Sequence, residues 1–103
     1  MSGCEGLKTV LVIGTLDTKG EECLYIRELV EQNGCRAILI DPGPLGRPLA
    51  RGDISREEVA QKAGWNLADL VETRDKGKII QTMTDGLAAW TAQLYQEGKI
   101  QGV

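Results

Sequence analysis

Residues 8–22 read KTVLVIGTLDTKGEE, and this stretch decides the fold class. The run from Thr9 to Ile13 is rich in β-branched residues, which is typical of a strand buried on both faces of a parallel sheet. Gly14 ends the run, and polar residues then lead into an amphipathic helix. In open α/β sheets, ligands bind beyond the carboxyl ends of strands, where helix N-termini present backbone N–H groups. We therefore expect ligand chemistry between Gly14 and Glu22.

The segment after this turn predicts a helix followed by a second strand. Thr18-x-x-Glu21 is a capping-box pattern with Thr18 as the N-cap, and Gly34 supplies the left-handed position that ends the helix. The strand over 36–41 then pairs in parallel with the first strand through a right-handed crossover. Asp41 is thereby placed at the same carboxyl edge as Gly14. The apolar stripe of the helix consists of Cys23, Ile26, Leu29 and Val30.

The second half of the chain is predicted to be mostly helical. The loop from Pro42 to Pro48 continues to about Asp53, because its prolines lack amide donors and exclude a helix or a central strand. Ser55-x-x-Glu58 is a second capping box, which opens a short helix ending near Gly64. Asn66 or Asp69 starts a further turn. A long helix over 75–96 follows, and residues 99–103 begin a third strand. The apolar stripe of the long helix consists of Ile79, Ile80, Met83, Leu87, Trp90 and Leu94.

The predicted fold class is α/β, a partial Rossmann-like three-layer fold with the order β-α-β-α-α-β. Its parallel sheet is truncated at the third strand. Residues 1–7 are expected to be a flexible lead-in, and residues 8–103 the first part of a Rossmann-like nucleotide-binding domain. Two strands and a stub make a thin sheet that leaves apolar helix surface exposed. We therefore expect a homo-oligomer, or association with the missing remainder of the domain.

Composition excludes several classes of function. The 103 residues carry 12 basic and 15 acidic side chains, a net charge of −3, which argues against a nucleic-acid partner. No segment has the length of a membrane span or the pattern of a secretory signal, so a cytoplasmic location is predicted. Three cysteines without a Cys-x-x-Cys spacing fit reduced thiols. The absence of histidine removes Ser-His-Asp and Cys-His catalysis.

The turn after the first strand matches neither a P-loop nor a Gly-x-Gly-x-x-Gly fingerprint. The segment 14–22, GTLDTKGEE, together with 41–48, DPGPLGRP, and 53–59, DISREEV, instead resembles one family. That family is typified by the ATP-binding N-terminal domain of the tomato mosaic virus resistance protein. The resemblance implies two Rossmann-like subdomains, of which this chain is part of the first. It also implies ATP and Mg²⁺ as ligands, with no established reaction.

The resemblance and the position of the turn together suggest roles for several residues. A phosphate would lie at the helix N-terminus beside Lys19. Asp17 would hold Mg²⁺ through its hard oxygen ligands and is the only candidate for orienting a water. Asp41 stands where an acidic residue takes ribose hydroxyls in Rossmann-type sites. The predicted binding residues are Gly14, Thr15, Asp17, Thr18, Lys19, Asp41 and Gly43. No catalytic residue is assigned.

Simpler interpretations stay open at this point. In one alternative, Thr18 serves only as a helix cap and Asp41 only as the start of a turn before Pro42. Lys19 is either a solvated side chain or a ligand contact, and a cation that opposes the helix dipole favours the ligand contact. The main alternative function is a non-catalytic interaction module, in which the long helix with Trp90 mediates assembly. A small-anion sensor at the same turn is a third hypothesis.

Overall fold

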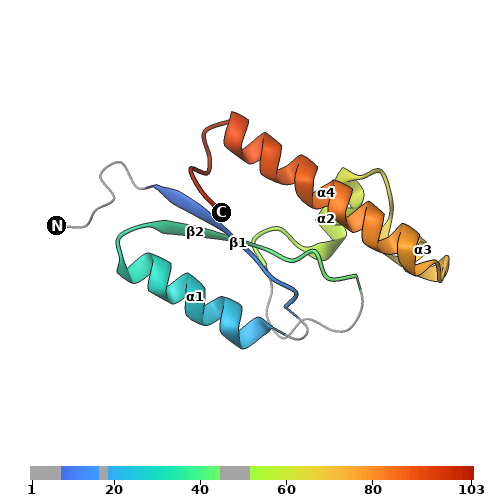
Figure 1. The fold of residues 1–103 in the computed structure, drawn as a ribbon, viewed down its shortest axis with the longest axis horizontal. Coiled ribbons are helices and arrows are strands. Elements are labelled where there is room, and N and C mark those ends of the chain that lie inside the picture. Colours follow the sequence, from blue (N-terminus) through green and yellow to red (C-terminus); the bar gives the residue numbers. More distant parts are fainter. Residues whose placement is uncertain (1–7, 17–18, 45–51) are drawn as a thin grey trace.

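The computed structural model of the chain describes residues 8–16, 19–44 and 52–103. Strands and helices alternate along the first half of the chain, and three helices make up most of the second half (Figure 1). The predicted α/β architecture is confirmed. The elements are β1 (Thr9–Ile13), α1 (Gly20–Gln32), β2 (Arg36–Ile40), α2 (Arg56–Lys62), α3 (Leu67–Glu72) and α4 (Lys76–Gln96).

The sheet is parallel and is extended by single bridges on both edges. β1 and β2 pair in the register that sets Thr9 opposite Arg36. On the other edge of β1, the N–H of Leu11 donates to the carbonyl of Gly102 at 2.9 Å, and Val10 and Gly102 form a parallel bridge. This bridge is the start of the predicted third strand. On the outer edge of β2, Ile40 and Ile54 form another parallel bridge, which the sequence did not reveal.

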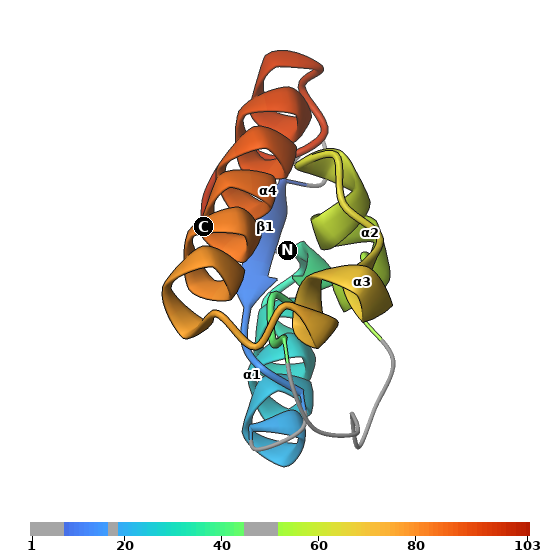
Figure 2. The same cartoon turned by 90° about the vertical axis from the view of Figure 1, so that its right-hand side faces the viewer.

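Helices cover the sheet on both faces. α1 lies on one face and α4 on the other, as the first view shows (Figure 1). The connection from β1 to β2 and the connection from β2 to residues 101–102 cross the sheet in opposite directions, so right-handed crossovers place their helices on opposite faces. α2 lies beside α4 and contacts α3 as well (Figure 2). The result is the three-layer arrangement that the element order predicts.

The main core fills the space between the sheet and the helices α2 to α4. Ile79, Met83 and Leu94 of α4 are buried there, and Leu87 and Trp90 pack against the same cluster. Ile80 was predicted in this stripe, but the prediction is wrong, because its side chain is 61% exposed. The other buried members of the core are Leu11, Ile40, Ile54, Val59, Ala60, Leu70 and Ile100.

Helix ends follow the predicted capping chemistry in the second half of the chain. Ser55 and Glu58 form the reciprocal capping box at the start of α2, and Asn66 caps α3. Gly64 follows α2 with a φ of 88°, a left-handed conformation that glycine adopts readily. Asp75 accepts a hydrogen bond from the N–H of Lys78 and caps α4.

The predicted start of α1 is wrong by about one residue. The N-cap is Lys19, which has non-helical dihedral angles and makes no side-chain cap hydrogen bond, whereas Thr18 lies outside the described residues. The N–H of Lys19 donates to the carbonyl of Thr15 at 2.8 Å. Gly34 ends α1 with a φ of 82°, as predicted.

The predicted burial of α1 is also partly wrong. Cys23 is buried, but Ile26 and Leu29 are 46% and 39% exposed, and Tyr25 is 62% exposed. A two-stranded sheet with single-residue extensions is narrower than the apolar arc of a helix, so the outer part of the arc lies in solvent. The exposed apolar surface expected from the thin sheet is therefore present, and α1 carries much of it.

The cysteines agree only in part with the expectation of reduced thiols. Cys35 takes part in a disulfide, whereas the buried Cys23 is a free thiol. The predicted flexible lead-in of residues 1–7 and the centre of the loop after β2 lie outside the described residues.

Candidate functional site

The turn after β1 runs directly over the first turn of α1. The N–H of Gly14 donates to the carbonyl of Ile40 at 3.2 Å, which holds the turn against the end of β2. A Cβ at Gly14 would lie 2.1 Å from Sγ of Cys23, so a larger residue there must displace the Cys23 side chain. Gly14 therefore sets the close approach of the strand end to the helix N-terminus.

Cys23 packs beneath this turn as an uncharged group. Burial raises the pKa of its thiol, and the nearby carboxylates of Glu22 and Asp41 raise it further. Because the thiolate is the reactive form, the raised pKa keeps Cys23 in its inert, protonated state at neutral pH. Its role is to fill the space that Gly14 leaves.

Asp41, predicted at the edge of the sheet, is the centre of a buried polar cluster. Its carboxylate is only 2% exposed and accepts a hydrogen bond from Nε of Arg56 at 2.9 Å. The other carboxylate oxygen accepts from the N–H of Gly43 at 2.9 Å and from the N–H of Leu16 at 3.3 Å. Asp41 thus joins the β1–α1 turn, the end of β2 and the start of α2.

Gly43 belongs to this cluster because its lack of a side chain lets Arg56, Asp41 and Thr15 lie close to the backbone there. A Cβ there would lie 2.9 Å from Nη2 of Arg56 and 3.0 Å from Oδ1 of Asp41. It would also lie 3.3 Å from Cβ of Thr15. Four residues of the carboxyl edge are therefore in one place, and three of them, Thr15, Asp41 and Gly43, were predicted from the sequence. The ribose contact assigned to Asp41 stays a prediction, and its observed contacts are internal.

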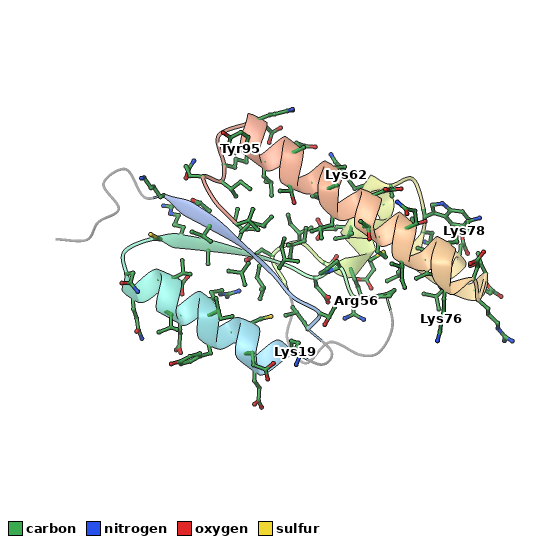
Figure 3. All side chains as sticks on the ribbon, viewed as in Figure 1. Lys19, Arg56, Lys62, Lys76, Lys78 and Tyr95 are labelled. Carbon is green, nitrogen blue, oxygen red and sulfur yellow. The ribbon has the colours of Figure 1, made fainter. Side chains whose placement is uncertain are left out.

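Lys19 is the exposed cation of the site. Its side chain is 66% exposed, and Nζ lies 3.8 Å from Oε2 of Glu22. Figure 3 shows Lys19 at the beginning of α1 and Arg56 toward the same end of the sheet. Glu21 and Glu22 in the first turn of α1 partly offset this positive charge. The turn therefore combines backbone N–H groups, one exposed ammonium and two nearby carboxylates.

The predicted metal ligand is not placed by the structure. Asp17 and Thr18 lie outside the described residues. Within residues 8–16, 19–44 and 52–103, no group of three or more acidic or cysteine side chains is arranged to hold a metal ion. Both oxygens of Asp41 are already engaged, as described above. The assignment of Mg²⁺ to Asp17 stays a prediction.

Arg56 is the site residue that sequence reasoning missed. It occupies the first position of α2, where a cation opposes the helix dipole. That local conflict is the same signal that singled out Lys19, and it indicates a carboxylate partner. The sequence alone did not show that this partner is Asp41, 15 positions earlier.

A hollow lies at the end of the sheet opposite to the Asp41 cluster. It encloses about 690 Å³ near the amino ends of the strands, between the C-terminal part of α1 and the segment after α4. Ligands in open α/β sheets bind at the carboxyl ends instead. Thr9, Glu31, Arg36, Ala37, Ile38, Gly98 and Lys99 line this hollow.

The strand order and the helices define a class of protein. β1 lies between β2 and the segment 101–102, and helices cover both faces, as in doubly wound α/β domains in which the order reverses at β1. The chain belongs to the UPF0261 family. The family model described as "Uncharacterised protein family (UPF0261) N-terminal domain" matches residues 8–103.

Relatives support the same assignment. A UPF0261 protein of Clostridium tetani is 38% identical over 96 residues, which cover 93% of this chain and 24% of the relative. A UPF0261 protein of Brucella suis is 32% identical over 94 residues, covering 91% of this chain and 22% of the relative. The chain thus spans less than a quarter of the length of these curated relatives.

These findings correct the sequence-based family assignment. The matching family model and the relatives are UPF0261, so the assignment to the family of the tomato mosaic virus resistance protein is wrong. No solved structure matches the chain. Among the helices of the described residues, none is long and apolar enough to cross a membrane.

Proposed function

We propose that this domain binds a nucleotide, with the phosphates at the turn between β1 and α1. The observation that carries the proposal is the reversal of strand order at β1, which has β2 on one side and residues 101–102 on the other. In doubly wound folds, the crevice beyond the carboxyl end of the strand at such a reversal is where ligands bind. Here that position is the turn from Gly14 to Lys19.

The chemistry of the turn supports an anionic ligand. Helix N-termini favour negative charge, and α1 is 13 residues long with no side-chain cap from Lys19. The exposed ammonium of Lys19 can leave Glu22 for a phosphate, since an exposed ion pair contributes little free energy. The internal bonds of Asp41 hold the turn and the loop at Gly43 in fixed positions, which lowers the entropic cost of binding.

Mg²⁺ enters the proposal as the ion that accompanies ATP. Asp17 is the residue proposed to contact it, because carboxylate oxygens suit this cation. A catalytic role is not part of the proposal. We also propose a cytoplasmic location, which agrees with a nucleotide ligand.

The test is calorimetric titration of the chain with Mg-ATP. Lys19→Ala is expected to weaken binding about tenfold, because a charge-assisted phosphate contact is lost. The matched control is Lys99→Ala, since Lys99 is equally exposed and also faces a carboxylate, that of Glu97 at 3.2 Å. Absence of saturable binding by the unaltered chain, or equal losses in both variants, would refute the proposal.

A second candidate function is assembly through α1. Tyr25, Ile26 and Leu29 are exposed and lie within an arc of about 100° on this helix. The sequence-based hypothesis assigned assembly to α4 and Trp90. In the structure, Trp90 is partly buried against the main core, and its Nε1 donates to the carbonyl of Glu58 at 3.1 Å. We propose that the arc on α1 pairs with a second copy of the chain.

Sedimentation of two variants tests this second candidate. Ile26→Ser with Leu29→Ser is expected to shift a dimer to a monomer, because the double change removes two of the three apolar side chains of the arc. Leu24→Ser is the control, since Leu24 is 40% exposed on the same helix but lies outside the arc. A monomeric unaltered chain would contradict the candidate without affecting the nucleotide proposal.

A further inference from the structure

An apolar slot lies next to the carboxyl edge of the sheet. Its volume is about 190 Å³, and its walls come from the loop after β2 and from the N-terminal half of α4. Whole small-molecule pockets enclose about 300–1,000 Å³, so this slot suits one group of a ligand. The lining residues are Pro42, Pro44, Ile80, Met83, Thr84 and Leu87.

The loop that forms one wall of the slot lies next to the proposed phosphate site. Pro42 and Pro44 flank Gly43, whose position is in close contact with Thr15 of the β1–α1 turn. The buried carboxylate of Asp41 fixes this loop through the N–H of Gly43. A ligand that contacts the turn with one end therefore has the slot within reach of its other end.

The lining of the slot fits a planar heterocycle. Met83 is buried at its inner side, whereas Ile80 is largely exposed and is the residue that departs from the buried stripe of α4. Proline rings and aliphatic side chains offer flat apolar contact on the faces of a ring. The hydroxyl of Thr84, which donates to the carbonyl of Ile80 at 2.7 Å, retains lone pairs that can accept from an exocyclic amine.

We infer that this slot binds the base of the nucleotide, with Ile80 as an outer wall that becomes buried on binding. The inference rests on the proposed function and names the second half of the same ligand. It also explains why a large apolar side chain of α4 faces solvent at this edge of the sheet. A base with an exocyclic amine, such as adenine, matches the hydroxyl of Thr84.

The experiment titrates the chain separately with Mg-ATP, adenosine and tripolyphosphate. Ile80→Ser is expected to weaken adenosine and ATP about tenfold and to leave tripolyphosphate unchanged, because only the apolar contact is lost. Lys19→Ala is expected to weaken ATP and tripolyphosphate and to leave adenosine unchanged. The control is Tyr95→Ser, which alters a side chain of the same helix that is 67% exposed and about 22 Å away along the axis.

The outcomes separate the two proposals. If tripolyphosphate binds and adenosine does not, or if Ile80→Ser and Tyr95→Ser have equal effects on adenosine, the base site is overturned and the phosphate site stands. If Mg-ATP, adenosine and tripolyphosphate all fail to bind, both proposals are overturned. Loss of adenosine binding in Ile80→Ser with an unchanged circular dichroism spectrum supports the slot, because a folding defect would also abolish tripolyphosphate binding.

Discussion

Gly86→Ala is expected to lower the free energy of unfolding by about 3 kcal/mol. In an open helix position the same change would be stabilising, since alanine has a higher helix propensity than glycine. At this position of α4, however, a Cβ would lie 2.1 Å from the backbone carbonyl oxygen of Val59. Backbone atoms of α2 cannot move aside locally, so α2 and α4 must separate. Urea denaturation followed by circular dichroism measures the effect.

Gly77→Ala is the matched control for this prediction. Gly77 lies in the same helix, and the nearest atom to its Cβ would be Oδ1 of Asp75 at 3.6 Å, an ordinary contact. We expect a gain of about 0.5 kcal/mol from the reduced entropy of the unfolded chain. Equal effects of the two substitutions would show that α2 and α4 are not packed backbone to backbone at Gly86.

Asp41→Ala is expected to destabilise the fold by about 4 kcal/mol, the loss typical of a broken buried ion pair. The substitution removes the counter-charge beside Arg56, which is only 3% exposed. It also removes the acceptor for the N–H groups of Leu16 and Gly43. The β1–α1 turn should therefore loosen together with α2. Thermal unfolding and amide hydrogen exchange at these residues measure both effects.

Asp53→Ala is the control for the ion pair. Asp53 also accepts a backbone hydrogen bond, from the N–H of Leu39 at 2.8 Å, but its side chain is 49% exposed. Because water can replace its contacts, the expected loss is about 1 kcal/mol. The pair Asp41→Leu with Arg56→Met should recover part of the stability lost in Asp41→Ala. Equal losses for Asp41→Ala and Asp53→Ala would contradict the buried role of Asp41.

Local patterns predicted much of the fold. The β-branched run at Thr9 and the apolar centre of the second strand predicted the parallel pair correctly. The capping box at Ser55 and the positive φ at Gly34 followed from short-range chemistry that needs no partner elsewhere in the chain. The order of strands and helices could therefore be predicted from the sequence. The close contact between Gly86 and the backbone of α2, by contrast, is visible only in the structure.

Features that depend on distant parts of the chain were not predictable. Ile26 and Ile80 have the spacing of buried residues, but their exposure depends on the width of the sheet and on the path of the loop after β2. The pairing of Asp41 with Arg56 depends on where α2 begins relative to the sheet. Gly43 stands between two prolines, a pattern that the sequence alone attributes to a turn. The structure shows a further reason for the glycine, because a side chain at this position would crowd Thr15.

The structure brings together only some of the predicted site residues. Thr15, Asp41 and Gly43 come together at the carboxyl edge, and Lys19 stands exposed at the start of α1. The observed contacts of Asp41 are with other residues of the chain, including a buried ion pair with Arg56. The sequence pattern did not distinguish this structural role from ligand binding. The slot beside Ile80 was not predicted, because its two walls are almost 40 positions apart in the chain.

The most direct test of the nucleotide proposal is a two-dimensional ¹H–¹⁵N spectrum of the chain recorded during titration with Mg-ATP. We predict saturable chemical-shift changes of the amides of Gly14, Thr15, Lys19 and Gly43. The amides around Ile80 in α4 are also expected to shift. Shifts confined to Arg36, Gly98 and Lys99, which line the hollow at the amino ends of the strands, would contradict the account. A spectrum that does not change would contradict it as well.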